Sequence, residues 1–297
     1  MEGAISMAFE RKLSKSIIGK LQDEQLYNDY LLPDIRKGDV FPAIRKEKIT
    51  FYHAGGNLFS YGKNGFETNI KFASVSKLIK KGKEETYINE KDLGKIRTIK
   101  KFTDEYKGIK ENCSRYSGIE AIGVSKVCEK DSYVKTDNDI VVLDVETSLE
   151  SLDEDRSQDR IDLLLLNKRK KQLRFYEAKD FSNGEIRSRM GKKPKVVEQI
   201  IRYKTQVKVK GIKIIEAYNK YISIVNGIFS IDLEEIIDID PDVYLLIFGF
   251  DRDQRSGQFK KYIKNDNSLK GIKGYSIGDM NNLKIENLWK GSKKLCT

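Results

Sequence analysis

The sequence predicts an α/β fold with a central mixed β-sheet flanked by helices. Short apolar runs at residues 140–145, 161–166 and 243–250 are typical of buried strands. Between the second and third of these runs, residues 194–221 carry apolar side chains at helical spacing. Strands and helices in this order favour a sheet that helices cover on both faces.

A separate α+β region is expected at the N-terminus. An amphipathic helix is predicted over residues 13–21, with Pro33 closing the helical region, and a β-hairpin with a Gly-Gly turn is predicted over 40–61. We therefore assign residues 1–97 to an N-terminal region that is a candidate for substrate recognition. Residues 98–297 are assigned to the core and its C-terminal extension.

The central elements have clear boundaries in the sequence. Residues 161–166 and 173–179 are joined by a short polar turn, so we expect an antiparallel hairpin. The Ser-, Asp- and Glu-rich stretch 146–159 before them predicts an exposed loop. After Pro194, which suits the first turn of a helix, one amphipathic helix is expected to end near Gly211 and a second helix to follow it.

The composition argues against several classes of site. The chain has one histidine, His53, which excludes a His-rich metal centre. Its three cysteines have no CxxC spacing, so neither a zinc site nor a disulfide framework is expected. No apolar run reaches the roughly 20 residues that span a bilayer, and no secretory leader is evident. These features predict a cytoplasmic protein that does not bind a membrane.

The positive charge is concentrated in one part of the chain. Residues 160–210 contain sixteen Lys and Arg against five Asp and Glu, a local net charge of +11 that equals the net charge of the whole chain. The stretch just before it, 131–159, contains ten acids against two bases. A local basic excess attracts polyanions, usually nucleic acid and less often an anionic membrane, although a solvated surface gives the same count.

A cluster of carboxylates and lysine is predicted on the central hairpin. If Leu166 pairs with Leu173, Asp162 faces Glu177 across the two strands, where Cβ atoms are about 4.5 to 5.5 Å apart. Lys179 lies two residues beyond Glu177 and therefore points to the same face. Because an acid inside an aliphatic run is costly to bury, the cluster calls for a compensating cation.

Carboxylate ligands suit a hard divalent cation, Mg²⁺ first and Mn²⁺ as its substitute. Such an ion would activate water and polarise a phosphodiester, while Lys179 orients the water or stabilises the charge that develops on the phosphate. The competing interpretation is a structural salt bridge between Lys179 and one carboxylate at a sheet edge. The basic excess that begins at the same place favours the phosphodiester interpretation.

Asp162, followed by Glu177-Ala178-Lys179 at the end of the next strand, resembles the signature of the PD-(D/E)XK nuclease superfamily, which includes restriction endonucleases. On the following helix, the pair Gln199 and Tyr203 at i and i+4 resembles the QxxxY motif of its RecB-like members. The resemblance implies a restriction-endonuclease-like core. It also implies Mg²⁺-dependent hydrolysis of phosphodiester bonds in DNA, with endonuclease action expected.

The resemblance covers about residues 138–250, and Ile161 stands where the name of the superfamily has proline. It also implies a role for individual residues. The implied metal ligands are the carboxylates of Asp162 and Glu177 and the carbonyl of Ala178. The rest of the implied catalytic set is Lys179, Gln199 and Tyr203. An additional upstream acid is common in such folds, and the candidates in order are Glu146, Glu105 and Glu111.

Contacts to nucleic acid are expected just before this helix, because helix N-termini favour anions. The candidate phosphate ligands are Arg187, Arg189, Lys192 and Lys193. DNA is the expected partner, and a homodimer is one arrangement that would cut both strands. Two alternatives stay open: an RNA-directed nuclease, and a DNA-binding protein that keeps a nuclease-like scaffold without cleavage.

Overall fold

The computed structural model describes residues 9–75, 79–80, 83–150, 158–188 and 191–295. The chain divides into two compact units, which we name after their sheets: the six-stranded unit (1–10, 138–222 and 233–297) and the five-stranded unit (11–137 and 223–232). The division near residue 137 differs from the boundary expected at residue 97. The reason is that the helices following residue 97 pack on the N-terminal sheet.

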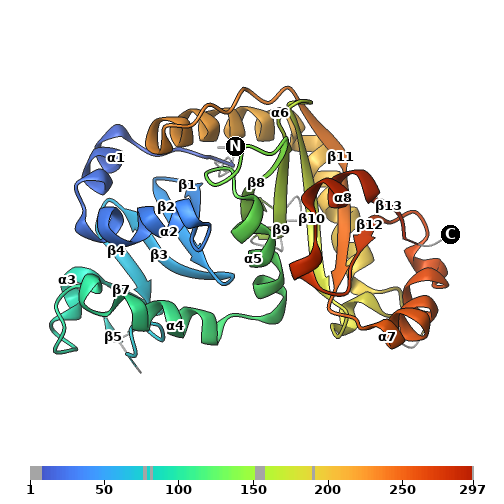
Figure 1. The fold of residues 1–297 in the computed structure, drawn as a ribbon, viewed down its shortest axis with the longest axis horizontal. Coiled ribbons are helices and arrows are strands. Elements are labelled where there is room, and N and C mark those ends of the chain that lie inside the picture. Colours follow the sequence, from blue (N-terminus) through green and yellow to red (C-terminus); the bar gives the residue numbers. More distant parts are fainter. Residues whose placement is uncertain (1–8, 76–78, 81–82, 151–157, 189–190, 296–297) are drawn as a thin grey trace, which may run out of the picture. The chain divides into compact units, whose positions relative to one another are not determined.

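The five-stranded unit is built on an antiparallel sheet in the order β1-β2-β3-β4-β7 (Figure 1). Helix α1 (Lys15–Gln22) buries Ile17 and Leu21, as the amphipathic pattern predicts. Pro33 does not close the helical region: it lies in the first turn of α2 (Leu32–Lys37), where the absence of an N–H donor costs nothing. The strands are β1 (Phe41–Arg45), β2 (Lys48–His53), β3 (Gly56–Gly62), β4 (Gly65–Asn69) and β7 (Tyr87–Asn89).

The predicted hairpin is formed by β2 and β3, but its turn is not the predicted Gly-Gly pair: Ala54 and Gly55 occupy it with φ angles of 47° and 83°, and Gly56 is already the first residue of β3. Helices α4 (Tyr106–Tyr116) and α5 (Ile119–Asp131) belong to this unit, and the ring of Tyr106 stacks on Phe59 of β3 at 6.2 Å between centroids. The smaller elements are β5 (Ile79–Lys80), which pairs with β6 (Lys83–Glu84), and α3 (Glu90–Leu93).

The six-stranded unit contains a mixed sheet in the order β13-β12-β11-β10-β9-β8 (Figure 1). Strand β10 is antiparallel to β9 and parallel to β11; β11 and β12 are also parallel, and the edge strand β13 is antiparallel to β12. The bounds are β8 (Ile140–Glu150), β9 (Gln158–Asn167), β10 (Gln172–Asp180), β11 (Asp238–Phe248), β12 (Lys273–Ser276) and β13 (Lys293–Lys294). This mixed sheet with its helices confirms the α/β class.

The acidic stretch after residue 145 is not a loop throughout. Strand β8 continues to Glu150, and its pairing with β9 extends to Glu150–Gln158. The backbone hydrogen bonds of this long hairpin therefore override the polar composition that predicted an exposed loop. Residues 151–157 lie outside the described part of the chain.

Helix α6 (Lys195–Phe229) is one helix of 35 residues and not two. Gly211 does not interrupt it, since a single glycine costs only about 1 kcal/mol in a helix interior and buried Val207, Ile214 and Tyr218 continue on both sides. Within the six-stranded unit, α6 connects the parallel strands β10 and β11 and ties to β8 through the Tyr218 hydroxyl, 2.7 Å from Asp144.

The opposite face of the sheet is covered by α8 (Ile285–Gly291). The hydroxyl of Tyr176 in β10 donates to the Leu288 carbonyl at 3.3 Å, and the guanidinium of Arg174 donates to the Trp289 carbonyl at 2.7 Å. Because side chains alternate along a strand, Phe175, Glu177 and Lys179 point to the other face, toward α6. Among the described residues of this unit, the smaller helices are α7 (Arg252–Ser256) and four short 3-10 or π turns, Gly184–Ile186, Lys260–Lys264, Asn267–Leu269 and Met280–Asn282.

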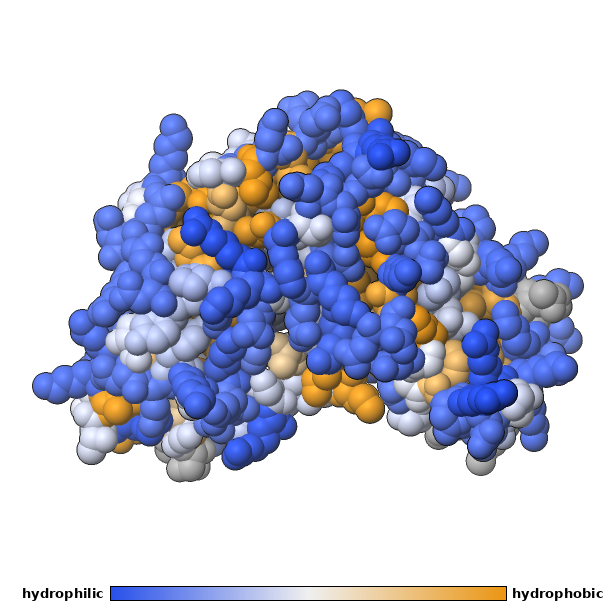
Figure 2. All heavy atoms as spheres, viewed as in Figure 1, coloured by the Kyte–Doolittle hydropathy of each residue, from blue (hydrophilic) through white to orange (hydrophobic). Residues whose placement is uncertain are grey.

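Hydrophilic residues cover most of the face shown in Figure 2, in line with the 34% of charged residues in the chain. Among the described residues, no helix combines the length and the apolar character that crossing a bilayer requires.

The hairpin turn gives a test of how α5 packs in the five-stranded unit. A Cβ atom at Gly55 would overlap the backbone of Ala121 in α5, whereas one at Gly65, which has a similar φ of +84°, would meet nothing within 4 Å. Both Gly→Ala changes strain a left-handed residue by about 1 to 2 kcal/mol. We expect Gly55→Ala to lower the free energy of urea unfolding by at least about 1 kcal/mol more than Gly65→Ala. Equal losses would show that the turn does not contact α5.

Candidate active site

The central hairpin has the predicted register. Leu166 pairs with Leu173, and the pairing runs to Leu163–Tyr176. The next position holds Asp162, whose carboxylate accepts a hydrogen bond from the backbone N–H of Ala178 at 2.8 Å. The register therefore brings the Asp162 side chain to β10 beside Glu177, where its carboxylate is hydrogen-bonded to the backbone of that strand.

Glu177 and Lys179 form a buried ion pair on β10. Their side chains are 3% and 8% exposed, and the Lys179 ammonium lies 2.9 Å from Oε1 of Glu177. The same ammonium lies 3.4 Å from Oε2 of Glu185, which follows the strand. Lys179 thus pairs with two carboxylates, and the Asp162 carboxylate lies on the neighbouring strand, so several acids gather at this end of β10. Acids brought close together favour a cation among them.

Glu185 was not predicted, and its position comes from local structure. The backbone N–H of Glu185 donates to the Asn183 side chain at 2.8 Å in a short 3-10 turn, Gly184–Ile186. The Asn-Gly pair at 183–184 is a turn signal that places the next acid back toward the end of β10. That signal could have identified Glu185 from the sequence.

Helix α6 brings Tyr203 to the same cluster. Its hydroxyl donates to the Arg160 carbonyl of β9 at 3.0 Å. Burial raises the pKa of this hydroxyl, and the negative charges of Glu177, Asp159 and Asp162 raise it further, so Tyr203 stays a proton donor at neutral pH.

Gln199 lies one turn before Tyr203 on the same face of α6. Its amide oxygen is buried and accepts no hydrogen bond from the residues that the structure describes. A buried acceptor without a donor is costly, by about 1 to 3 kcal/mol. The position therefore suits an external donor such as a water molecule or a substrate group.

A second acid of β9, Asp159, anchors α6 next to the cluster. Its carboxylate accepts hydrogen bonds from Arg202 at 2.9 and 3.0 Å and from Gln206 at 2.6 Å. Arg202 and Gln206 lie on either side of Tyr203 in the sequence of α6, so their bonds to β9 fix the position of Tyr203 along the strand. Sequence reasoning missed them because Asp159 fell inside the predicted loop.

The candidates for an upstream acid have other partners. Glu146 sits in β8 with a φ of 51°, and its carboxylate lies 2.7 Å from Nε of Arg160. Glu105 pairs with Arg97 at 2.9 Å in the five-stranded unit, where Glu111 also lies, on α4. Glu146 remains the candidate on the sheet that carries Asp162, and Arg160 would have to release it.

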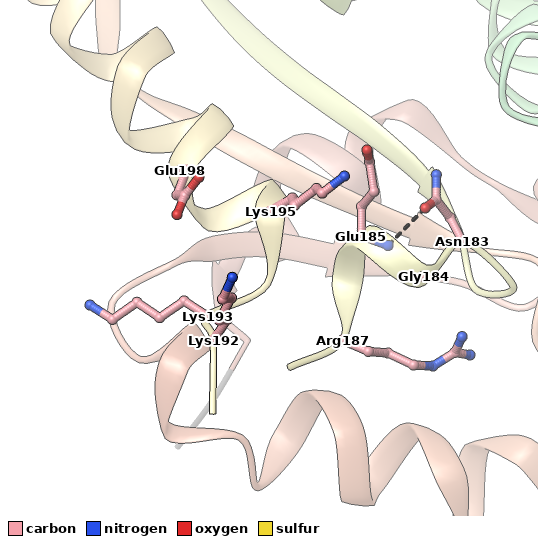
Figure 3. A pocket seen from close by; sticks show the side chains of 8 residues that line it. All are labelled: Asn183, Gly184, Glu185, Arg187, Lys192, Lys193, Lys195 and Glu198. Atoms are coloured by element: carbon pink, nitrogen blue, oxygen red, sulfur yellow. Dashed lines mark hydrogen bonds between the residues drawn. The ribbon is translucent and has the colours of Figure 1, made fainter. Parts of the chain in front are cut away.

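A pocket of about 570 Å³ opens where the β10–α6 connection meets the start of α6 (Figure 3). Glu185 belongs to its lining, so the pocket borders the Lys179 ion pairs. The other lining residues are Asn183, Gly184, Arg187, Lys192, Lys193, Lys195 and Glu198. A pocket that contains four basic residues beside a buried carboxylate cluster is suited to a phosphate group.

The four predicted phosphate ligands differ in their surroundings. Lys192 and Lys193 are exposed and line the pocket. Arg187 also lines it, but its guanidinium donates to the Phe181 carbonyl at 2.6 Å and therefore helps to hold the connection. Arg189 lies outside the described residues. Lys195, which was not predicted, is the additional cation of this pocket.

The donors available at this site are oxygen atoms. Among the described residues, no group of three or more His, Cys, Asp and Glu side chains is placed to hold a metal. The donors that remain are the carboxylates of Asp162 and Glu177 and the carbonyl of Ala178. Mg²⁺ is commonly held by one or two carboxylates while it keeps several waters, so this sparse set of hard oxygen donors fits Mg²⁺ better than zinc.

Comparisons with protein-family models, with curated proteins and with solved structures find no match to this chain.

The two acids of β9, Asp162 and Asp159, should differ in how much an Asp→Asn substitution changes the stability of the fold. Asp162→Asn removes a charge that Glu177 repels and keeps an acceptor for the Ala178 N–H. We therefore expect the free energy of urea unfolding either to fall by less than about 0.5 kcal/mol or to rise. Asp159→Asn breaks the ion pair with Arg202, and we expect a loss of about 1 to 3 kcal/mol. A larger loss in Asp162→Asn than in Asp159→Asn would mean that Asp162 is structural.

Proposed function

We propose that this protein is a Mg²⁺-dependent nuclease that hydrolyses phosphodiester bonds in DNA. One observation carries the proposal: Asp162, Glu177 and Lys179 come together on adjacent strands of a mixed sheet beside a basic pocket, with Glu177 and Lys179 buried and Asp162 partly exposed. Two acids brought together on neighbouring strands, one of them buried, destabilise a fold unless a cation offsets them. A restriction-endonuclease-like core and an endonuclease of the PD-(D/E)XK type are the finer forms of this proposal, and they rest on the motif.

Each residue has a role in the proposed reaction. Asp162, Glu177 and the carbonyl of Ala178 would hold the ion, which supplies Lewis-acid activation of the phosphodiester when bound. Lys179 orients the attacking water and stabilises negative charge on the phosphate as the P–O bond breaks. Its ion pair with Glu177 fixes the ammonium at the end of β10 before any substrate binds.

Residues of α6 and of its pocket would position the substrate. Tyr203 is held protonated and can donate to a phosphate oxygen when it releases the Arg160 carbonyl, and the buried amide oxygen of Gln199 can accept a hydrogen bond from the water or the nucleotide. Lys192, Lys193 and Lys195 supply positive charge for the adjoining phosphates. Glu198 also lines this pocket and limits how closely a phosphate approaches the helix.

A second candidate function is DNA binding without cleavage. It is favoured by the small number of acids at the site, because among the described residues no third metal-ligating side chain joins Asp162 and Glu177. Such a protein would bind DNA in the absence of metal, and its affinity would fall steeply with salt.

The test is cleavage by the purified protein of supercoiled plasmid, of linear single-stranded DNA and of an RNA of matched sequence, with Mg²⁺, with Mn²⁺ and with EDTA. We expect metal-dependent cleavage of DNA. Removing a general acid or base typically slows a reaction about 10²- to 10⁴-fold, so we expect Lys179→Ala to lose at least about 100-fold and Glu177→Gln to show no cleavage.

Lys270→Ala is the matched control, because Lys270 is an exposed lysine of the same unit that does not line the pocket at the start of α6. Circular dichroism of each variant confirms that the fold is retained. Full activity of Lys179→Ala contradicts the proposed mechanism. Binding of DNA without cleavage by the wild-type protein under every metal supports the second candidate instead.

A further inference from the structure

The six-stranded unit has a second basic pocket, at the β12–β13 edge of its sheet. The pocket has a volume of about 560 Å³ and shares no lining residue with the pocket at the start of α6. Among the described residues, its lining contains no carboxylate. The five cations that line it are Arg255, Lys260, Lys264, Lys293 and Lys294.

Within the described part of the chain, none of these five cations forms an ion pair. The nearby Lys273 of β12, which does not line the pocket, is by contrast paired with Asp242 at 2.5 Å. Two of the acids close in sequence are used as helix caps: Asp251 accepts from the N–H of Gln254 at 2.7 Å, and Asp266 accepts from that of Ser268 at 2.9 Å. Five like charges around one pocket repel one another. An anion bound in the pocket would reduce this repulsion.

The distribution of the charges indicates an extended anion. Arg255 lies on α7, Lys260 and Lys264 on a π-helical turn, and Lys293 and Lys294 on β13. Because the cations come from three separate elements, a chain of regularly spaced phosphates neutralises more of them than a single phosphate does.

An aromatic ring lies in the same pocket. Tyr275 of β12 is partly exposed and belongs to the lining, and its ring packs against Gly291, where a Cβ atom would come within 2.9 Å of the ring. Glycine at this position therefore leaves room for the ring. Basic side chains beside an available aromatic ring are the features that proteins use to bind single-stranded nucleic acid, with bases stacked on the ring.

We propose that the β12–β13 pocket binds the phosphodiester backbone of a single-stranded nucleic acid, with a base against Tyr275, at a site separate from Asp162, Glu177 and Lys179. The proposal rests on the proposed function only in that nucleic acid is the ligand. It adds a second binding region that would hold the strand while the first site acts on it.

The test is fluorescence anisotropy of a labelled DNA single strand with EDTA present, over about 50 to 200 mM salt. We expect Lys260→Ala/Lys293→Ala to weaken binding and to lower the slope of log affinity against log salt by about 0.7 for each phosphate that the variant no longer neutralises. Tyr275→Ala should weaken binding of the single strand more than binding of its duplex. Lys270→Ala/Lys284→Ala is the matched control, because both lysines are exposed in the same unit and line neither pocket.

Lys260 and Lys293 are exposed, so the fold should tolerate their replacement, and thermal unfolding of each variant verifies this. Equal effects of the two double variants overturn the proposal, as does lysine-dependent binding to phosphatidylserine vesicles without binding to DNA. Because EDTA excludes cleavage from the measurement, pocket-dependent binding by a protein that never cuts would support this inference and contradict the nuclease. Cleavage by the wild-type protein, together with unchanged binding in the pocket variants, would support the nuclease and contradict this inference.

Discussion

The pairing of β9 with β10 is the constraint on which the rest of the six-stranded unit depends. One register, with Leu166 opposite Leu173, buries the aliphatic side chains of both strands and at the same time brings Asp162 to Ala178 and Glu177. A shift by one residue would turn every side chain of a strand to the other face and expose the hydrophobic ones. Burial of the hydrophobic core therefore fixes the register and, with it, the positions of the acids. The site is therefore a consequence of how the core packs.

Helix α6 adds a second set of side chains to the site that this register builds. It crosses from β10 to β11 on the face that carries Glu177, and Asp159 fixes it through Arg202 and Gln206. That anchor sets Tyr203 beside the carboxylates, where burial first and the negative charges second raise the pKa of its hydroxyl and keep it protonated. The basic pocket forms where the helix begins, so one element supplies both the cover of the cluster and the cations beside it.

The strands of the core and the place of the cluster could be predicted from the sequence, because an aliphatic run with one acid and a period of two leave few arrangements. Other features depend on contacts between distant residues. The continuity of α6 through Gly211 depends on side chains buried against the sheet, and the extension of β8 to Glu150 depends on pairing with β9. Composition alone suggested a break and a loop there. The same holds for Glu146, which pairs with Arg160 and has a left-handed backbone conformation that no local sequence pattern predicts.

The most direct test of the central claim, that Asp162 and Glu177 form a divalent cation site, is titration of the protein with Mn²⁺ followed by electron paramagnetic resonance. Asp162→Asn and Glu177→Gln are compared with Asp279→Asn, which removes the charge of an exposed acid in the same unit. The account predicts that one Mn²⁺ site disappears in the first two variants and persists in the third. Unchanged Mn²⁺ binding in Asp162→Asn and Glu177→Gln would contradict it.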